Sequence, residues 1–333
     1  MFTEEQQALR ETVRAVAERH DDPWPALRDQ VGVPALAVPE RHGGLGAGLR
    51  ELQVVAEELG RTLAPGPFLG SAVLATLALL EAGDEAANAR LLPRLAGGEV
   101  ASLAWAGANG RWAIDTSGTA CTATDENVLN GTAHYVLDGD QADILLVVAG
   151  PALFEVDPAE ARRTHTPAMD QTRRLATIEL DGVPGRRVGD LRAGLAGVRD
   201  GVCAVLAAEQ AGAAARALEL TVEYTGQRRQ FGRPIGGFQA LKHRMADLHV
   251  LVETARSAAY AATESSRLAA VAKAYCSEAF SAVAAEMIQL HGGIAITWEH
   301  DAHRYFKRAH GSAQLFGQPH EHLARVGPDR AER

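Results

Sequence analysis

The chain has 333 residues, of which 47% are hydrophobic and 23% charged, and its formal net charge is −9. This length exceeds one small core, so we expect two or three subdomains of an ordinary globular protein. The acidic balance argues against a nucleic-acid partner, because binding to phosphates needs a basic surface.

No apolar run reaches the roughly 20 residues of a bilayer span, and the acidic, polar N-terminus is unlike a signal peptide. The three cysteines, Cys121, Cys203 and Cys276, are far apart and fit no metal or disulfide spacing. We therefore expect a cytoplasmic protein with no membrane partner and no metal site, in which each cysteine is a small buried apolar residue.

Residues 1–100 carry the apolar spacing of helices. Thr3, followed by Glu4 and Glu5, is typical of an N-cap and first turn. Further helices are predicted at Leu49–Leu63, Ser71–Leu80 and Glu85–Leu95. We interpret residues 1–100 as an N-terminal helical domain.

Helical periodicity stops in residues 101–190, where short β-prone runs replace it. The turn dipeptides Asn130-Gly131 and Asp138-Gly139 lie between such runs. This pattern predicts a compact antiparallel barrel or sandwich as the central domain. The runs are Val100–Trp105, Trp112–Ile114, Val128–Leu129, His134–Leu137, Ile144–Val148, Leu153–Val156 and Leu175–Leu180.

Residues 191–333 return to helix. Ala-rich stretches cover Ala196–Gly226, Gly237–Ser266 and Ala269–His291, and a shorter helix follows them. Three long helices and a shorter one predict an antiparallel four-helix bundle. The fold class is therefore α+β, with a helical domain, a β-domain and a bundle in that order.

Two motifs in the bundle are typical of a binding site for a large phosphorylated ligand. Residues 227–239 contain arginines beside glycines, and residues 289–293 read Gln-Leu-His-Gly-Gly. A guanidinium can bind phosphate oxygens in pairs, and glycine lets a ligand approach the backbone. Alternatively, the arginines form a solvated helix end, and Gly292-Gly293 is a plain helix C-cap.

Several segments in this order resemble the acyl-CoA dehydrogenase family over nearly the whole length. Within that family, the sequence resembles the short actinobacterial members, some of which form one subunit of a heteromeric enzyme. The matching segments are Leu36–Gly46, Glu57–Gly60, Leu129–Gly139, Ala208–Gly212, Arg228–Gln239 and Gln289–Gly293.

The resemblance implies FAD-dependent removal of two hydrogens from Cα and Cβ of an acyl-CoA thioester, with an electron-transfer flavoprotein as acceptor. It also implies a flavin between the β-domain and the bundle, whose ADP half reaches a neighbouring subunit. Arg228 would then bind pyrophosphate, and Arg304 and Arg308 are candidates for a CoA phosphate. The other cofactor contacts that it implies are Phe231 and Gln239 at the adenine end, Gln289, Gly292 and Gly293 beneath it, and Trp105 and Tyr135 near the flavin.

The usual catalytic base of the family is missing at both positions that the resemblance identifies. One position holds Phe316 and the other Val202, and neither side chain can accept the α-proton. Asp301 is our first candidate for a substitute base and Glu299 our second. Asp301 has an alternative role as the cap of the helix that follows it.

The β-domain departs from the family pattern as well. Ala104–Gly110 lacks hydroxyl and acidic groups, and Tyr135–Asp138 lacks the usual threonine, so we expect a weak flavin-ring site in this chain. We hypothesise a homo- or hetero-oligomer, dimer or tetramer, in which related subunits share sites. The alternatives are a flavin-dependent monooxygenase and a non-catalytic subunit that only grips FAD or supports its partner.

Overall fold

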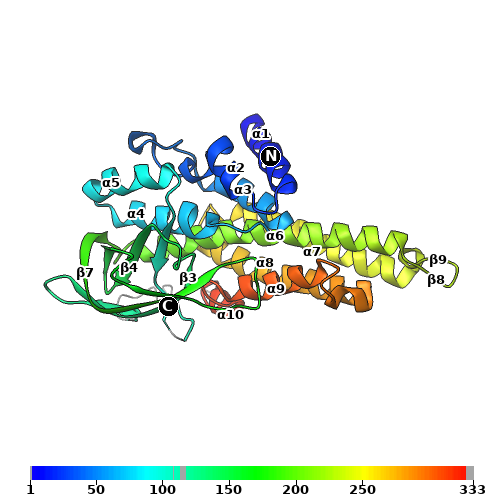
Figure 1. Cartoon of the computed structure of the whole chain (residues 1–333). Coiled ribbons are helices and arrows are strands. Elements are labelled where there is room, and N and C mark those ends of the chain that lie inside the picture. Colours follow the sequence, from blue (N-terminus) through cyan, green and yellow to red (C-terminus); the bar gives the residue numbers. More distant parts are fainter. Residues whose placement is uncertain (1, 108, 113–117, 328–333) are drawn as a thin grey trace.

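The computed structural model describes residues 2–107, 109–112 and 118–327, and its helices and strands follow the predicted order (Figure 1). Residues 113 and 114 of the predicted strand Trp112–Ile114 lie outside these ranges. The first helices are α1 (Glu4–Arg19), α2 (Trp24–Ala26), α3 (Leu49–Thr62), α4 (Thr76–Ala82) and α5 (Glu85–Ala96). A π-helical segment, Phe68–Ala75, leads directly into α4.

The start of α1 confirms the predicted N-cap. The Thr3 hydroxyl accepts a hydrogen bond from the Gln6 N–H at 3.1 Å, and the Gln6 side chain accepts one from the Thr3 N–H at 3.1 Å. This reciprocal pair satisfies two of the donors that a helix start leaves free.

Two glycines let α3 cross closely over α6 (Leu195–Gln227). A Cβ on Gly60 would lie 2.0 Å from the Glu209 carbonyl oxygen, and one on Gly212 would lie 1.9 Å from that of Glu57. The Glu57 carboxylate is buried at the crossing and accepts two hydrogen bonds from Arg256, at 2.8 and 2.6 Å. Two segments that resemble the family thus join the N-terminal helices to the bundle.

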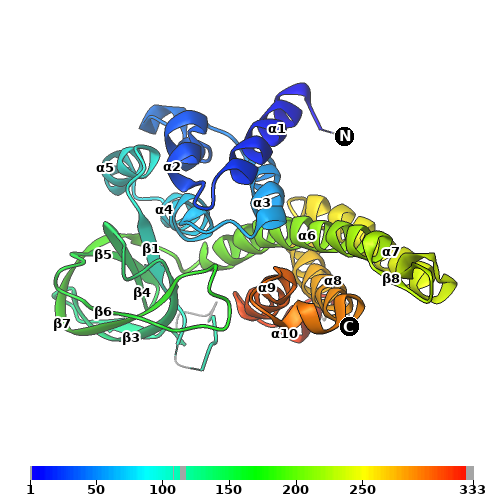
Figure 2. The same cartoon turned by 45° about the vertical axis from the view of Figure 1, so that its right-hand side comes forward.

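The central strands form one closed barrel. They are β1 (Ala101–Ala104), β2 (Cys121–Ala123), β3 (Val128–Leu137), β4 (Ile144–Ala149), β5 (Ala152–Val156), β6 (Arg162–His165) and β7 (Leu175–Asp190). The sheet order is β1-β4-β2-β3-β7-β5, β5 pairs back onto β4, and β6 pairs with β7. Most pairs are antiparallel, but β1 and β2 both run parallel to β4. Figure 2 shows the barrel beside the bundle, with the N-terminal helices above both.

The prediction of a turn at Asn130-Gly131 is wrong, because β3 continues through both residues. The strand has an irregularity there, between the pairs Leu129–Val183 and Gly131–Leu180. Gly131 has a φ of +135°, and a Cβ on it would lie 2.5 Å from the Ala120 carbonyl oxygen. Glycine is needed for the close approach of β2, and Asp138-Gly139 is the actual turn after β3.

The C-terminal part is a helical bundle, as predicted. Its helices are α6, α7 (Gln239–Ala261), α8 (Ser266–His291), α9 (Ala302–Gln314) and the short α10 (Pro319–Leu323). The small strands β8 (Arg229–Gln230) and β9 (Arg233–Pro234) close the α6–α7 hairpin, which projects beyond the other helices (Figure 1).

Residues Ser266–Ile296 are long and apolar enough to cross a membrane by length and composition. However, α8 packs against α6, α7, α9 and α10, which is typical of the central helix of a bundle. Its buried side chains include Phe280 and Met287, both fully inaccessible. The three cysteines are also buried and unpaired, as expected.

Candidate functional site

A cavity of about 440 Å³ lies between the barrel and the bundle. Hollows of this size are typical of small-molecule sites. Its barrel side is formed by Asn109–Trp112, Tyr135 and Leu175, and its bundle side by Gly311, Gln314, Leu315, Gln318, His320 and Glu321. The resemblance placed the flavin ring between these same two domains, and Tyr135 is the predicted contact that lines the cavity.

Phe316 is buried against the wall of this cavity. Its side chain is 1% exposed, and its ring lies 4.6 Å from that of Trp112, which in turn meets Trp105 edge-on at 5.5 Å. Phe316 also has a φ of +59°, an uncommon backbone conformation for a bulky residue. Three aromatic rings therefore fill the position where the family resemblance locates a carboxylate. Trp105, a predicted flavin contact, is 1% exposed and is not among the residues that line the cavity.

The backbone that leads to Phe316 is held by Lys273, a buried lysine of α8 whose ammonium reaches the C-terminal end of α9. The Lys273 ammonium donates to the carbonyls of Ser312 and Ala313, at 3.3 and 3.1 Å, and to the Ser277 hydroxyl at 3.1 Å. A cation there compensates the free carbonyls of the helix end. Burial lowers the pKa of Lys273 to about 8.

His322 holds the other side of the same loop. Its Nε2 lies 2.9 Å from the Phe316 carbonyl oxygen, and because that oxygen can only accept, Nε2 carries the proton. Burial lowers the pKa of His322 to about 4, so the ring is neutral near pH 7. Both ends of the Phe316 segment are therefore fixed by buried donors.

Glu321 is a carboxylate in the cavity wall that sequence reasoning missed. Its Oε2 accepts a hydrogen bond from the Gln318 N–H at 2.7 Å, which caps α10. The spacing of Gln318, Pro319 and Glu321 is typical of a helix start, but it does not indicate a cavity.

Val202, at the second position where the family usually has its base, is fully buried on α6.

The second predicted site lies at the far end of the bundle. Arg228 ends α6, and Phe231, in the β8–β9 loop, is 91% exposed with a φ of +52°. The side chains of Arg228, Gln239 and Gln289 are exposed, and within the described ranges they make no hydrogen bond or ion pair. An exposed guanidinium and two amides are suitable donors for a diphosphate and a nucleoside.

The structure brings the two predicted motifs together at this end. The Tyr224 hydroxyl, one helical turn before Arg228, donates to the His291 carbonyl at 3.2 Å, directly before Gly292. Gly292 has a φ of +68°, and a Cβ on Gly292 or Gly293 would meet no atom within 4 Å. Open space beside a glycine turn and free donors fit the nucleotide half of FAD.

The cavity and this nucleotide-type site lie far apart within one chain. Tyr224 and His291 lie at the C-terminal ends of α6 and α8. Lys273, which bonds the Ser312 and Ala313 carbonyls beside the cavity, precedes His291 by 18 residues of α8, about 27 Å of helix. The cavity lies beside the barrel, and the α6–α7 hairpin projects away from it (Figure 1). The two sites are therefore separated by several helical turns within one chain.

Asp301 and Glu299 lie near the nucleotide-type site. Asp301 begins α9, whose 13 residues separate it from the cavity by about 20 Å, and its Oδ1 pairs with Arg304 at 3.1 Å. Its side chain makes no capping bond; the Ala302 N–H donates to His300 Nδ1 instead, at 3.1 Å. Asp301 therefore occupies the N-cap position, as the alternative predicted, but its carboxylate makes no capping hydrogen bond.

Arg308, a sequence candidate for a CoA phosphate, is buried in an internal ion network. Its guanidinium donates to Glu209 at 3.1 Å and to Thr172 at 2.8 Å, and it lies 3.6 Å from Asp170. Its side chain is 4% exposed, so it offers no free donor to a phosphate. Instead, Arg308 joins the loop before β7 to α6 and α9.

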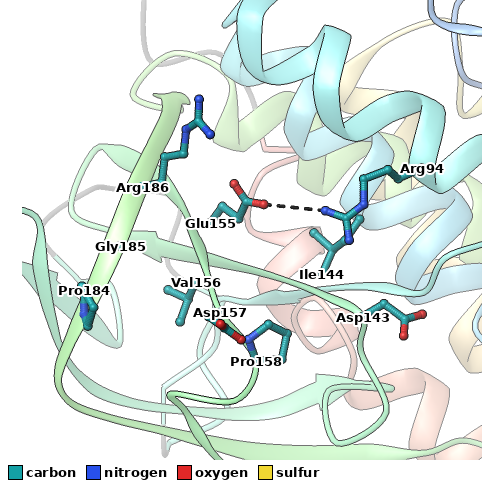
Figure 3. A pocket seen from close by; sticks show the side chains of 10 residues that line it. All are labelled: Arg94, Asp143, Ile144, Glu155, Val156, Asp157, Pro158, Pro184, Gly185 and Arg186. Carbon is teal, nitrogen blue, oxygen red and sulfur yellow. Dashed lines mark ion pairs between the residues drawn. The ribbon is translucent and has the colours of Figure 1, made fainter.

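A larger hollow, about 540 Å³, lies on the outer side of the barrel beneath α5 (Figure 3). Glu155 in its wall is already paired, with Arg90 at 2.7 Å and with Arg94 at 3.9 Å. None of the sequence-predicted site residues lines it. We therefore take the smaller cavity and the distal end of the bundle as the candidate functional site.

Two models of protein-family domains match this chain. Residues 3–99 match the model of the acyl-CoA dehydrogenase N-terminal domain, and residues 203–325 match that of the C-terminal domain. The chain is 42% identical to acyl-CoA dehydrogenase IpdE2 of Mycolicibacterium smegmatis, over 98% of both chains.

Two solved structures have the same fold. One is a variant of the Tcur3481-Tcur3483 steroid ACAD, with a TM-score of 0.86, 30% identity and 97% of each chain covered. The other is the ChsE4-ChsE5 complex from Mycobacterium tuberculosis, with a TM-score of 0.86, 28% identity and coverage of 100% of this chain and 99% of that one.

Proposed function

The chain belongs to the acyl-CoA dehydrogenase family, whose members are FAD-containing oxidoreductases of lipid metabolism, and we propose that it is one subunit of a shared-site dehydrogenase. In this proposal, the chain grips the nucleotide half of a FAD whose flavin ring lies in a related subunit. That subunit supplies the base that removes the α-proton of an acyl-CoA thioester.

The burial of Phe316 is the observation that carries this proposal. Dehydrogenation at Cα and Cβ needs a group that accepts the α-proton, and an aromatic ring has no such group. The Phe316 ring is packed against Trp112, and the Phe316 carbonyl is bonded to His322. The ring therefore keeps the position that a carboxylate would need to occupy. Val202, at the other base position, is aliphatic and fully buried.

The distal end of the bundle supports the nucleotide role. FAD, when bound, accepts the hydride that leaves Cβ. The guanidinium of Arg228 would pair with pyrophosphate oxygens, and Phe231 would pack on the adenine face. Gln239 and Gln289 would donate to the nucleoside, and the Gly292-Gly293 turn would let its ribose approach the backbone.

The separation of the two sites supports an assembly of related subunits. The cavity near Phe316 and the donors near Arg228 lie several helical turns apart within the chain, so we infer that a neighbouring subunit completes each of them. The ChsE4-ChsE5 structure is a complex of two differently named proteins, which supports a pairing of unlike subunits here. Homodimers or tetramers would place the same donors at an interface, and a mass measurement of the assembly distinguishes them from a pair of unlike subunits.

The substrate class rests on the family and on one relative. We propose an acyl-CoA substrate, and the steroid ACAD among the similar structures supports a steroid-derived acyl group. We further propose a cytoplasmic location, with an electron-transfer flavoprotein as the oxidant of the reduced flavin.

The direct test compares two neighbouring arginines in the assembled oligomer. Arg228→Ala removes the free guanidinium, whereas Arg229→Ala removes one that already donates to the Gly232 carbonyl at 2.9 Å. We expect Arg228→Ala to lower the FAD content per subunit pair at least tenfold, because losing one charge-assisted hydrogen bond costs about 1.5–3 kcal/mol. Arg229→Ala should retain the wild-type FAD content. Unchanged FAD content in Arg228→Ala would favour a subunit that only supports its partner.

A second candidate is a self-contained dehydrogenase, favoured by the position of Glu321 in the cavity wall. Its free carboxylate oxygen would be the base in that case. Glu321→Gln keeps an acceptor for the Gln318 N–H but cannot take a proton. A loss of turnover of more than about a thousandfold in Glu321→Gln, with FAD retained, would establish this candidate against the shared site.

A further inference from the structure

Three helix ends meet beside the proposed nucleotide site, in a cluster made of Tyr224, His291 and His300. Tyr224 lies in the last turn of α6, His291 ends α8, and His300 precedes α9. The Tyr224 ring stacks on the His291 imidazole with centroids 4.3 Å apart and planes at 22°. His300 lies 4.5 Å from His291 and 6.2 Å from Tyr224.

Each side chain of the cluster also makes a hydrogen bond to a backbone group. The Tyr224 hydroxyl donates to the His291 carbonyl at 3.2 Å, and the Arg228 N–H donates to the Tyr224 carbonyl at 2.8 Å. Arg228 is thus one hydrogen bond from Tyr224, and Gly292 is the residue after His291. The Tyr224 side chain thus links the two nucleotide-gripping segments.

The imidazoles have defined tautomers. His291 Nδ1 lies 2.7 Å from the Met287 carbonyl oxygen, which can only accept, so Nδ1 carries the proton in the neutral ring. His300 Nδ1 accepts from the Ala302 N–H at 3.1 Å, so its proton is on Nε2. Burial lowers the pKa of His291, which favours this neutral form.

We propose that Tyr224 is a positioning residue for FAD, which sets the spacing between the Arg228 donor and the Gly292-Gly293 turn. It acts through the bond from its hydroxyl to the His291 carbonyl and through its stacking on the His291 ring. This inference rests on the proposed function, because it concerns the same nucleotide site. Without Tyr224, the ends of α6 and α8 keep their helices but lose this hydrogen bond and this ring contact between them.

Tyr305 provides a matched control for the hydroxyl. Its side chain is buried, and its hydroxyl donates to the Arg61 carbonyl at 2.6 Å, also between two helices. Tyr305 lies in α9, and Arg61 is in α3, which crosses α6 well before its C-terminal end. Tyr305→Phe and Tyr224→Phe therefore each remove one hydroxyl-to-carbonyl bond, but Tyr224→Phe alone removes it beside the nucleotide segments.

The experiment measures the rate of FAD release from the loaded oligomer after dilution, by the rise in flavin fluorescence, and the melting temperature of each variant. We expect Tyr224→Phe to release FAD about fivefold faster, the effect of one lost hydrogen bond, and Tyr224→Leu about 30-fold faster, since it also loses the stacking. Tyr305→Phe should change release less than about twofold while lowering the melting temperature as much as Tyr224→Phe.

Equal release rates for Tyr224→Phe and Tyr305→Phe would overturn the positioning role. The failure of the proposed function has a different signature. If the wild-type oligomer carries no FAD, or if Arg228→Ala keeps FAD, the nucleotide site itself is refuted. If FAD depends on Arg228 but release is unchanged in both Tyr224 variants, the role of Tyr224 alone is refuted.

Discussion

Replacing Phe316 by alanine tests whether this side chain contributes to packing and stability or to the reaction. The ring is 1% exposed and lies 4.6 Å from Trp112. Removal of a buried phenylalanine ring costs about 3–5 kcal/mol, and the aromatic pair with Trp112 contributes about 1 kcal/mol of such a total. Alanine leaves the backbone strain at φ +59° unrelieved. We therefore expect Phe316→Ala to lower the free energy of unfolding by about 4 kcal/mol.

The assay for Phe316→Ala has two parts, urea unfolding of the full chain and acyl-CoA dehydrogenation by the assembled oligomer. Phe280→Ala is the matched control, because Phe280 is fully buried on α8 and is absent from the cavity wall. Where both variants remain folded, we expect turnover within about threefold of wild type, since no proton passes through this position.

Two results would refute this reasoning about Phe316. A stability loss below about 1 kcal/mol would show that the ring does not fill the site as the structure has it. A fall in turnover of more than about a hundredfold with FAD retained, and without such a fall in Phe280→Ala, would show that the position takes part in the reaction.

The remaining predictions concern the crossing of α3 and α6 and the buried lysine. Gly212→Ala should destabilise the chain by several kcal/mol in urea unfolding, because its Cβ would lie 1.9 Å from the Glu57 carbonyl oxygen. The control is Gly226→Ala in the same helix, where a Cβ would meet no atom within 4 Å; it should be neutral or stabilising by up to about 1 kcal/mol. Equal effects of the two substitutions would contradict the close crossing. For Lys273, whose pKa is lowered to about 8 from 10.5, the unfolded chain holds a proton between these pH values that the folded chain has released. The free energy of unfolding of wild type relative to Lys273→Met should therefore rise by about 3 kcal/mol across this window. If urea unfolding at pH 7.5, 9 and 10 gives the same difference between the two proteins, the burial of a charged amine is refuted.

The helices were predictable because their signals are local. The predicted Ala196–Gly226 differs from the observed α6, Leu195–Gln227, by one residue at each end, and Thr3 caps α1 as expected. The turn at Asn130-Gly131 failed for a non-local reason. Close packing of β2 demands a glycine at position 131, so the dipeptide there does not form the turn that it favours in isolation.

The candidate site was predictable only in part. Arg228 and Gly292 carry chemistry that is visible in the sequence, and counting along the chain identified Phe316. The cavity wall, with Glu321 in it, depends on how α10 returns to the barrel, and no local pattern encodes that path. Likewise, His300 rather than the Asp301 carboxylate satisfies the first N–H of α9, because the side-chain geometry of the loop decides between two suitable acceptors.

The most direct measurement of the shared-site account is the visible spectrum of this chain purified alone, recorded before and after anaerobic addition of an acyl-CoA. We predict that the flavin absorbance is not bleached until the related subunit with a catalytic carboxylate is added. Stoichiometric flavin that the acyl-CoA bleaches in the isolated chain would contradict the account, because a base would then exist within this polypeptide.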